Sequence, residues 1–292
     1  MSGTTRRVFL AQSAALLPVS RMAFAREAFT ATNLGVQLYT VRNVIGKDPL
    51  TTLKAIEEIG YTEVECIYAT LDEIWPALKQ TRLRPVSVHI DEAIFSKGGS
   101  ELDSALGKAK EHGFDYAVVP YIPPKERGGA DMFQRLAETL NKSGEKAQSH
   151  GLKLCYHNHA FEYKPLDGAN GQTGLEILMS STQKGVVWLE LDVFWASVAG
   201  HNPVELLKTY SGRVALAHLK DKARDFTKVQ YNENVPKTAF KEDGSGSIDF
   251  PAVLKAAAGA GVEHYFVEQD QTPGDPVASL RKSFDYLKTQ FA

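Results

Sequence analysis

The chain has 292 residues, of which 43% are hydrophobic and 23% charged, and its net charge at pH 7 is -2. This composition is typical of a globular protein with one large domain or two small ones. The small net charge and the lack of a compact basic run argue against a general affinity for nucleic acid or membrane surfaces. No segment reaches the roughly 18 continuous apolar residues of a membrane span. The two cysteines, Cys66 and Cys155, are too few for a disulfide framework, and we expect both to be buried thiols.

The N-terminal residues have the order of features of an export signal. The pair Arg6-Arg7 precedes a weakly apolar stretch at 9–19 and a small-x-small cleavage motif at 23–25. Adjacent arginines followed by x-Phe-Leu are typical of the twin-arginine (Tat) route. We therefore expect residues 1–25 to be a signal peptide that the Tat machinery reads, and the mature protein to be periplasmic. A disordered basic tail with a chance arginine pair is the alternative.

From residue 33 onward, strand-like and helix-like segments alternate eight times. The strand-like segments are 34–39, 62–68, 84–90, 115–121, 152–158, 186–192, 213–219 and 263–269. Apolar residues at helical spacing follow them, for example at 49–59, 131–150 and 174–180. Helix starts are expected at Thr70, with Glu73 completing a capping box, and at Ser100, Asn202, Asp249 and Asp275.

Eight strand–helix units over about 260 residues match a (β/α)8 TIM barrel in number and length. A doubly wound open sheet is the alternative, but a dinucleotide-binding sheet of that kind needs a G-x-G-x-x-G turn after a strand, and none is present. No linker rich in Pro, Gly or Ser divides the chain. The sequence therefore predicts one barrel domain over residues 33–292.

Polar side chains gather where the predicted strands end. These residues are Tyr39 and Arg42 after the first strand, Glu65 and His89 in the second and third, His157, His159 and Glu162 at the fifth, Asp192 at the sixth, His218 and Lys220 at the seventh, and Glu268 at the eighth. In a TIM barrel the carboxyl ends of the strands meet at one face, which carries the active site. The sequence therefore predicts a site at that face.

Four of these residues form a candidate metal site. Glu162, Asp192, His218 and Glu268 come from four consecutive strands. Three carboxylates and one imidazole suit Mn²⁺, Mg²⁺, Co²⁺ or Zn²⁺, and a divalent ion would neutralise the converging charges. Any one of them alone is more simply a solvated loop residue or a structural histidine. Trp195, just after Asp192, either forms an apolar floor for a sugar or packs in the core.

Several motifs together resemble the sugar phosphate isomerase/epimerase family with the xylose isomerase-like barrel. They are LGVQLYTVR at 34–42, YHNHAFEY at 156–163, WLELDVFWASVAG at 188–200, AHLKD at 217–221, GSGSIDFPAVL at 244–254 and YFVEQD at 265–270. The resemblance covers about residues 34–290. It implies a barrel with one divalent metal ion held by Glu, Asp, His and Glu from strands five to eight.

Three of these ligand positions match Asp192, His218 and Glu268 directly. Strand five departs from the family pattern. Many members have Ile-Glu-Asn-His there, whereas this chain has Tyr-His-Asn-His, so His157 stands at the Glu position. We expect Glu162 to be the fourth ligand, with His157 as the alternative. In the epimerases that strand-five Glu is also an acid/base, so the substitution affects the expected mechanism.

The resemblance implies an isomerase or epimerase that forms an enediolate from a sugar held on the metal ion. Glu268 and Glu162 are candidate bases, His157 or His159 would shuttle protons, and Lys220 would stabilise the oxyanion. Contacts with the sugar are expected from Tyr39, Arg42, Glu65, His89 and Trp195. Export favours a non-phosphorylated sugar, since phosphorylated sugars are mainly cytoplasmic. The long segment 221–248 is expected to form a lid or a wall of the substrate site.

Two alternatives use the same scaffold. Expulsion of a β-substituent from the common intermediate would make the protein a keto-sugar dehydratase or a keto-glycoside lyase. Loss of catalysis would leave a sugar-binding barrel, which His157 in place of Glu allows. Nucleic-acid hydrolysis, known from an endonuclease branch of the family, is disfavoured by the charge, by export and by too few ligands for a trinuclear zinc site.

Overall fold

The computed structural model describes Met1 and residues 29–291. The expected signal peptide, residues 1–25, lies outside the described residues apart from Met1. Eight parallel strands close into a barrel in the order β1-β10-β7-β6-β5-β4-β3-β2. They are β1 Leu34–Gln37, β2 Glu63–Ile67, β3 Arg84–His89, β4 Tyr116–Val119, β5 Lys153–His157, β6 Val187–Asp192, β7 Val214–Leu219 and β10 His264–Val267. The predicted TIM barrel is confirmed.

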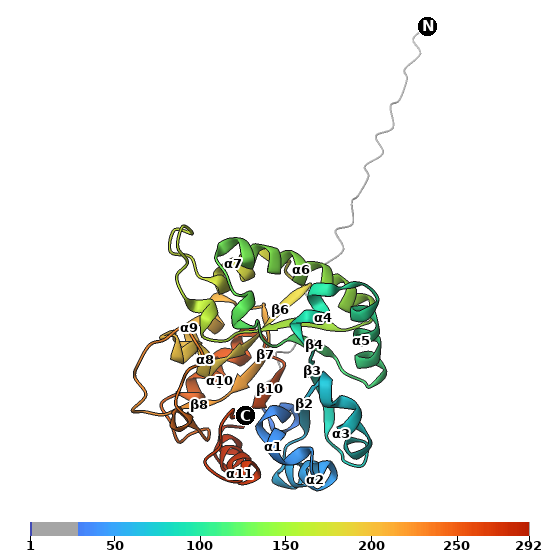
Figure 1. Cartoon of the computed structure of the whole chain (residues 1–292), viewed down its shortest axis with the longest axis vertical. Helices are drawn as coiled ribbons and strands as arrows, with labels where there is room; N and C mark the ends of the chain where they lie inside the picture. The colour runs from blue at the N-terminus through green and yellow to red at the C-terminus, as the bar shows by residue number, and fades with distance from the viewer. Residues whose placement is uncertain (2–28, 292) are drawn as a thin grey trace.

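The helices surround this barrel, with their apolar faces against the strands (Figure 1). They are α1 Arg42–Ile45, α2 Pro49–Ile59, α3 Leu71–Leu78, α4 Glu92–Lys97, α5 Gly99–Glu111, α6 Ala130–Ser149, α7 Gly174–Ser181, α8 Val193–Val198, α9 Pro203–Thr209, α10 Phe250–Ala260 and α11 Pro276–Leu287. Among the described residues no helix has the length and apolarity that crossing a membrane requires.

Four of the outer helices begin in the same way. An Asp or Asn side chain accepts a hydrogen bond from a backbone N–H of the first turn, and proline takes the first helical position, or the second in α10. The capping residues are Asp48, Asn202, Asp249 and Asp275. The capping bond satisfies a backbone N–H that has no partner within the helix, and proline restricts φ to a helical value. Together they define the residue at which each of these helices begins.

The predicted capping box at Thr70 and Glu73 is wrong. The Thr70 side chain makes no capping bond. Its hydroxyl instead donates back to the Ile67 carbonyl, 3.3 Å away. The reason is local: a 3-10 turn at Tyr68–Thr70 leads straight into α3, so Thr70 has φ -107° and ψ 5° rather than the extended backbone that a capping residue usually adopts.

Two apolar clusters hold the fold together. The larger lies between the helices and the barrel. The smaller comes from the strands themselves and includes Val118, Cys155, Leu216 and Phe266. Because side chains two apart share a face of a strand, Cys155 lies below His157 and Leu216 below His218. The small cluster therefore fills the barrel beneath the polar residues of the strand ends, and Cys155 and Cys66 are both buried free thiols, as expected.

The segment after β7 is tied closed at its base. β8, Asp221–Lys222, pairs antiparallel with β9, Phe240–Lys241. The Asp221 carboxylate accepts hydrogen bonds from the backbone N–H groups of Gly246 and Ile248, at 2.7 and 3.1 Å. This long connection appears beside β8 in Figure 1. Both ends of this connection meet at the Asp221 carboxylate, so the connection forms an ordered wall at the mouth of the barrel.

Candidate metal centre

A cavity of about 760 Å³ opens at the carboxyl ends of the barrel strands. Its lining includes His89, His157, Lys220 and Glu268, which end or follow β3, β5, β7 and β10. Phe240 of the long segment forms part of its wall. The cavity thus lies at the face where the sequence placed its polar residues, and where TIM barrels carry their active sites.

Four side chains in and beneath this cavity converge closely enough to hold one ion. His157, Asp192, His218 and Glu268 each offer a ligand atom, and these atoms lie within 4.8 Å of one another. We call this set the mouth group. His157 Nε2 lies 3.8 Å from Asp192 Oδ2, and His218 Nδ1 lies 3.0 Å from Glu268 Oε2. All four side chains are buried.

Glu162, the expected strand-five ligand, is not part of this group. Its Oε1 accepts a hydrogen bond from the Tyr156 hydroxyl at 2.7 Å, and its Oε2 accepts one from the His159 backbone N–H at 2.9 Å. The 3-10 turn Phe161–Tyr163 folds Glu162 back toward its own strand. His157 takes its place in the mouth group. Burial raises the pKa of Glu162 to about 8, although these hydrogen bonds oppose the rise.

The mouth group fits a divalent metal ion. Two imidazole nitrogens and two carboxylate oxygens form a mixed set that suits Zn²⁺, Mn²⁺ or Co²⁺. Asp192 Oδ1 accepts the Trp195 backbone N–H at 2.8 Å. Asp192 Oδ2 is buried and makes no hydrogen bond within the described residues, and the Lys220 ammonium lies 3.0 Å from it as an ion-pair partner. A buried carboxylate oxygen without a hydrogen bond is costly, and a cation held by this group of ligands would complete its coordination.

The backbone beneath Asp192 is held by Asn158, the residue between the two histidines of YHNHAFEY. The Asn158 side-chain oxygen accepts the Asp192 N–H at 3.0 Å, and its amide nitrogen donates to the Asp192 carbonyl at 3.4 Å. One asparagine thus fixes the end of β6 against the end of β5. This contact holds the backbones that carry His157 and Asp192 side by side.

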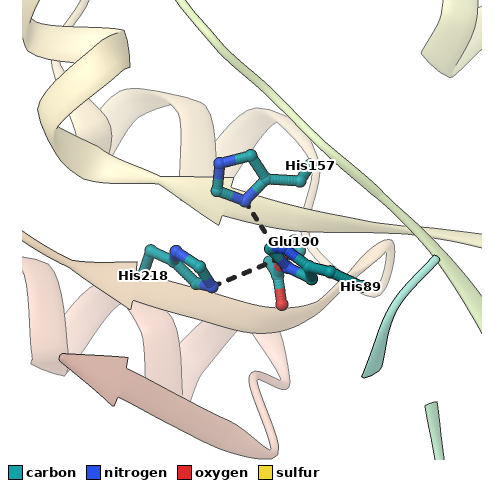
Figure 2. Close-up of side chains that lie close together, drawn as sticks. All are labelled: His89, His157, Glu190 and His218. Atoms are coloured by element: carbon teal, nitrogen blue, oxygen red, sulfur yellow. Dashed lines mark hydrogen bonds and ion pairs between the residues drawn. The ribbon is translucent and has the colours of Figure 1, made fainter. Parts of the chain in front are cut away.

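A second group lies one layer deeper. His89, His157 and His218 surround the Oε2 atom of Glu190 at 3.0, 2.9 and 3.4 Å. Figure 2 shows His157 and His218 turned toward this carboxylate, with His89 beside it. Glu65 lies at the same depth and accepts from His218 Nε2 at 2.6 Å. These ligand atoms are also close enough for an ion, but Glu190 Oε2 already has hydrogen bonds with two histidine rings, whereas Asp192 Oδ2 makes none in the described part of the chain and is paired with Lys220.

The charges of this deeper group stabilise one another. Burial acts to lower the pKa of His89, but Glu65 and Glu190 outweigh it and raise the pKa to about 9. Burial and Glu65 act to raise the pKa of Glu190, but His218 and His157 outweigh them and lower it to about 2. The deeper layer therefore holds ionised carboxylates that accept hydrogen bonds from the rings above and beside them.

Lys220 brings a buried positive charge to the cavity. Its Nζ lies 3.0 Å from Asp192 Oδ2, 2.8 Å from Glu268 Oε2 and 2.7 Å from Asp270 Oδ1. Burial acts to lower the pKa of Lys220, but these three carboxylates raise it well above its usual value. Lys220 is therefore a fixed ammonium that can donate to an oxygen bound beside the mouth group.

His159 and Trp195 line the cavity with unused polar atoms. His159 Nδ1 and Trp195 Nε1 are both buried and have no hydrogen-bond partner within the described residues. Their rings lie 5.4 Å apart between centroids. Burial and the charge of Lys220 hold the pKa of His159 well below its usual value, so its imidazole is neutral. A neutral imidazole in a cavity lining is suited to accept a proton from a bound ligand.

The expected sugar-contacting residues divide into two sets. Tyr39, His89 and Trp195 line the cavity. Glu65 is buried in the layer below, and Arg42 lies outside the cavity lining. The Arg42 guanidinium stacks on the Tyr39 ring at 3.9 Å and donates to the Asp270 carbonyl at 2.7 Å. Arg42 thus packs against two cavity-lining residues, Tyr39 and Asp270, and does not itself line the cavity.

Asp270 was missed in the sequence. It lines the cavity, pairs with Lys220, and has a pKa that burial raises to about 6. The signal was present, because Asp270 follows Glu268 by two residues in YFVEQD and strand alternation places both on one face. Tyr68 and Phe240 also line the cavity. They come from a 3-10 turn and a two-residue strand, for which periodicity gives no signal.

Comparison with known families agrees with this geometry. The sequence profile of the xylose isomerase-like TIM barrel family matches residues 53–290. The chain belongs to this family. The resemblance found in the sequence motifs is therefore confirmed for this xylose isomerase-like barrel.

Curated relatives match this xylose isomerase-like barrel over part of their length. An inosose dehydratase of Clostridium botulinum (strain Alaska E43 / Type E3) is 33% identical over 181 residues, which are 58% of this chain and 58% of the relative. The chain thus spans a little over half the length of the curated relatives that it matches.

Solved structures match it over nearly their whole length. A sugar phosphate isomerase/epimerase from Parabacteroides distasonis ATCC 8503 superposes with a TM-score of 0.74 at 19% identity, covering 87% of this chain and 97% of that one. The IOLI protein with a bound zinc atom superposes with a TM-score of 0.66 at 18% identity, covering 89% and 99%. These likenesses establish the fold.

Proposed function

We propose that this protein is a metal-dependent lyase of non-phosphorylated keto sugars. It would remove the proton next to the carbonyl and expel a substituent from the following carbon, as a dehydratase or a keto-glycoside lyase does. The observation that carries the proposal is the end of β5, where imidazoles stand in place of a carboxylate: His157 in the mouth group and His159 in the cavity lining. The similarity to inosose dehydratases also supports it, because a dehydratase is a lyase that expels water.

The chemistry separates elimination from epimerisation. Epimerisation takes a proton from one face of a carbon and returns one to the other face, so it requires two proton carriers on opposite sides. Elimination on a single face requires one carrier, which removes the proton and then delivers it to the leaving oxygen. A neutral imidazole can perform both steps, and His159 supplies one in the cavity wall.

The chain's own residues would act as follows. His157, Asp192, His218 and Glu268 would hold the divalent ion, which when bound supplies a Lewis acid for the carbonyl and a neighbouring hydroxyl. His159 would take the proton next to the carbonyl, and Lys220 Nζ would donate to the oxygen on which charge develops. The C–O bond to the substituent then breaks, a C=C bond forms, and His159 returns its proton to the departing oxygen.

A first experiment measures the metal content of the purified mature chain. Wild type is compared with Asp192→Ala and Glu268→Ala, after loading with Mn²⁺, Zn²⁺, Co²⁺ or Mg²⁺. We expect one ion per wild-type chain and none in either variant. Glu263→Ala is the matched control, because this carboxylate flanks the same strand as Glu268 at its other end, where it pairs with Lys153. A wild type that stays free of every metal contradicts the proposed site.

A second experiment follows the reaction of keto sugars in D₂O. Elimination gives an unsaturated ketone, seen by ultraviolet absorbance, together with the released substituent. We expect His159→Ala to lose this activity by about 10²–10⁴-fold, the usual contribution of an acid/base group, while its metal content stays at one ion per chain. A His159→Ala variant that retains wild-type turnover would remove this residue from the mechanism.

An isomerase or epimerase is the second candidate. Glu268 of the mouth group also lines the cavity, so a carboxylate and the imidazole of His159 reach it from different strands. Deuterium entering the substrate carbon, with a changed configuration and no unsaturated product, would favour this function. Sugar binding without turnover of any keto sugar would instead favour a non-catalytic barrel.

We also propose that residues 1–25 direct the protein to the periplasm by the twin-arginine route. The support is the arginine pair with the apolar stretch and small-residue motif that follow it. In cell fractionation, the wild-type chain should appear shortened in the periplasm, whereas the double variant Arg6→Lys, Arg7→Lys should stay uncleaved in the cytoplasm. Equal export of both would reject this route.

A further inference from the structure

The cavity at the barrel mouth exceeds the needs of one sugar ring. Its volume of about 760 Å³ lies in the upper part of the roughly 300–1,000 Å³ range in which proteins bind drug-sized ligands. The polar groups that would handle a sugar, including His157, His159, Lys220 and Glu268, come from β5 to β10. They account for one side of the cavity and leave the other side without an assigned role.

The other side is mostly apolar. Ile67, Tyr68 and Ala69 end or follow β2, Ile94 comes from α4 after β3, and Val235 comes from the segment over the mouth. The lining on this side also contains three charged residues close to Ile94 and Val235 in the sequence, namely Asp91, Glu233 and Lys237. In the strand order of the closed barrel, β2 stands opposite β6 and β3 stands opposite β7. This apolar wall therefore faces the strands that carry Asp192 and His218, across the cavity.

The chemistry of this wall selects the kind of group it would cover. A second sugar would bring hydroxyl groups that need hydrogen-bond partners once water is removed. Four of the five apolar-wall side chains are hydrocarbon and offer none. Two of the charged neighbours are already engaged, because Asp91 accepts the Ala93 N–H at 2.8 Å and Glu233 pairs with Arg127 at 3.0 Å. Tyr68 adds a half-buried ring that can stack on a flat apolar group. An aromatic group suits both the hydrocarbon side chains and the Tyr68 ring, whereas a sugar could stack on the ring but would leave its hydroxyl groups against hydrocarbon.

We propose that the substrate is a keto-glycoside with an apolar, aromatic-sized aglycone, its oxidised sugar at the mouth group and its aglycone on the apolar wall. This inference rests on the proposed lyase function and specifies its leaving group. Removal of the proton next to the carbonyl breaks a C–H bond, and the glycosidic C–O bond breaks with it. A C=C bond forms in the sugar, and the aglycone leaves as an alcohol that carries the proton.

The test compares four keto-sugar probes with the same ring and the same carbonyl position: the free sugar, the methyl glycoside, the phenyl glycoside and a disaccharide. The metal-loaded full-length mature protein is used, and kcat and KM are measured separately for each. The phenyl-to-methyl ratio of 1/KM should be about ten, which is about 1.4 kcal/mol, the value of burying roughly 55 Å² of apolar surface, whereas the better leaving ability of phenol acts on kcat. A disaccharide that outperforms the phenyl glycoside overturns the apolar assignment.

Two variants of wall residues test whether the preference for the phenyl glycoside arises at the apolar wall. Tyr68→Ala should reduce the phenyl-to-methyl ratio to about one to three. Ile94→Thr, which keeps the β-branch but shortens the side chain and adds a hydroxyl group, should lower the same ratio; it tests the wall independently if the first variant has a folding defect. Tyr210→Ala is the matched control, since Tyr210 is also half-buried but lies outside the cavity lining, at the end of α9. An unchanged ratio in both wall variants overturns the inference.

Binding of unreactive glucosides separates this inference from the proposed function. Phenyl and methyl glucosides that lack the keto group are titrated into the metal-loaded protein by calorimetry. If no keto sugar reacts but the phenyl compound still binds about tenfold more tightly, the lyase function fails and the aglycone site stands. If keto sugars are eliminated at equal rates whatever their aglycone, the lyase function stands and the aglycone site fails.

Discussion

At the scale of single residues, each mouth-group histidine uses one ring nitrogen to fix the other. His157 Nδ1 donates to Glu190 at 2.9 Å, which leaves Nε2 facing Asp192. His218 Nε2 donates to Glu65 at 2.6 Å, which leaves Nδ1 facing Glu268. A carboxylate behind a histidine ligand sets the ring orientation and the proton-bearing nitrogen, and so raises metal affinity.

Glu190→Gln should therefore weaken metal binding by about 10–100-fold, the usual cost of losing such a partner. The amide keeps the shape of the side chain but removes the charge that holds His157 and His218. Metal affinity is measured by competition with a coloured chelator.

The matched control for Glu190→Gln is Glu63→Gln. Glu63 accepts from His264 Nδ1 at 2.8 Å and pairs with Arg84 at the opposite end of the barrel. Its loss should lower thermal stability and leave metal affinity unchanged. Equal metal affinities for wild type and Glu190→Gln would show that Glu190 does not orient the ligands.

Glu162 gives a prediction about pH. Burial raises its folded-state pKa to about 8 from an ordinary value of 4.5. Between these values the folded chain holds a proton that the unfolded chain has lost, so this contribution to stability is fully present below about 4.5 and is lost as the pH rises through about 8. Glu162→Gln resembles the protonated form, and the stability of the variant relative to wild type should increase from pH 5 to pH 9.

Urea unfolding of both proteins at several pH values measures this difference. Because all other titrating groups are shared, they largely cancel in the comparison. Glu233→Gln is the control, since that carboxylate is in the same region but pairs with Arg127 at 3.0 Å. A stability difference between wild type and Glu162→Gln that stays constant across this range would contradict the prediction.

Sequence reasoning at this scale succeeded where a side chain belongs to a strand. Asp192, His218 and Glu268 end or follow strands, so their inward direction follows from two-residue alternation. Glu162 lies five residues beyond the end of β5, and its direction depends on a 3-10 turn whose geometry no periodic pattern encodes. For the same reason the sequence leaves the choice between Glu162 and His157 open, whereas the 3-10 turn Phe161–Tyr163 directs Glu162 away from the mouth group.

At the scale of elements, the long segment after β7 depends on one close approach. Gly246 donates its N–H to Asp221 at 2.7 Å, and a Cβ atom there would collide with the Asp221 carboxylate and the Lys222 carbonyl. Gly246→Ala should therefore open the base of the segment and destabilise the protein by about 1–3 kcal/mol, the usual cost of overpacking. Urea unfolding measures the loss.

Gly259→Ala is the matched control for this substitution. Gly259 lies inside α10, and a Cβ atom there would have no neighbour within 4 Å. Alanine favours a helix over glycine by roughly 0.5–1 kcal/mol, so this variant should be more stable than wild type. Loss of stability in both variants would mean that the effect at Gly246 is not specific to the approach of Asp221.

Long helices and the eight barrel strands were predicted from the sequence, whereas the shortest elements were not. The eight strand positions and helices such as 49–59 and 131–150 followed from periodicity, because a long apolar face repeats its signal. The two-residue strands β8 and β9 and the short helices α4 and α8 carry too few residues to show a period. They were missed, although they shape the mouth of the barrel.

At the scale of the whole molecule, metal binding should stabilise folding. An ion that binds the folded chain alone adds about 2.7 kcal/mol when its concentration is a hundred times Kd. For a domain of this size that corresponds to a rise in Tm of about 5 °C or more. Differential scanning fluorimetry of chelator-treated protein, with and without Zn²⁺ or Mn²⁺, measures the shift. Asp192→Ala should show none, and an equal shift in that variant would place the ion elsewhere.

Lys220 has a consequence for how the ion arrives. Its ammonium is covalently part of the chain, so the mouth never loses all of its positive charge, and Asp192, Glu268 and Asp270 converge on it. Lys220 therefore holds the ligand carboxylates in place before the metal ion arrives. Loading should then be a single second-order capture whose observed rate rises in proportion to the metal concentration, with no slow phase of chain rearrangement behind it.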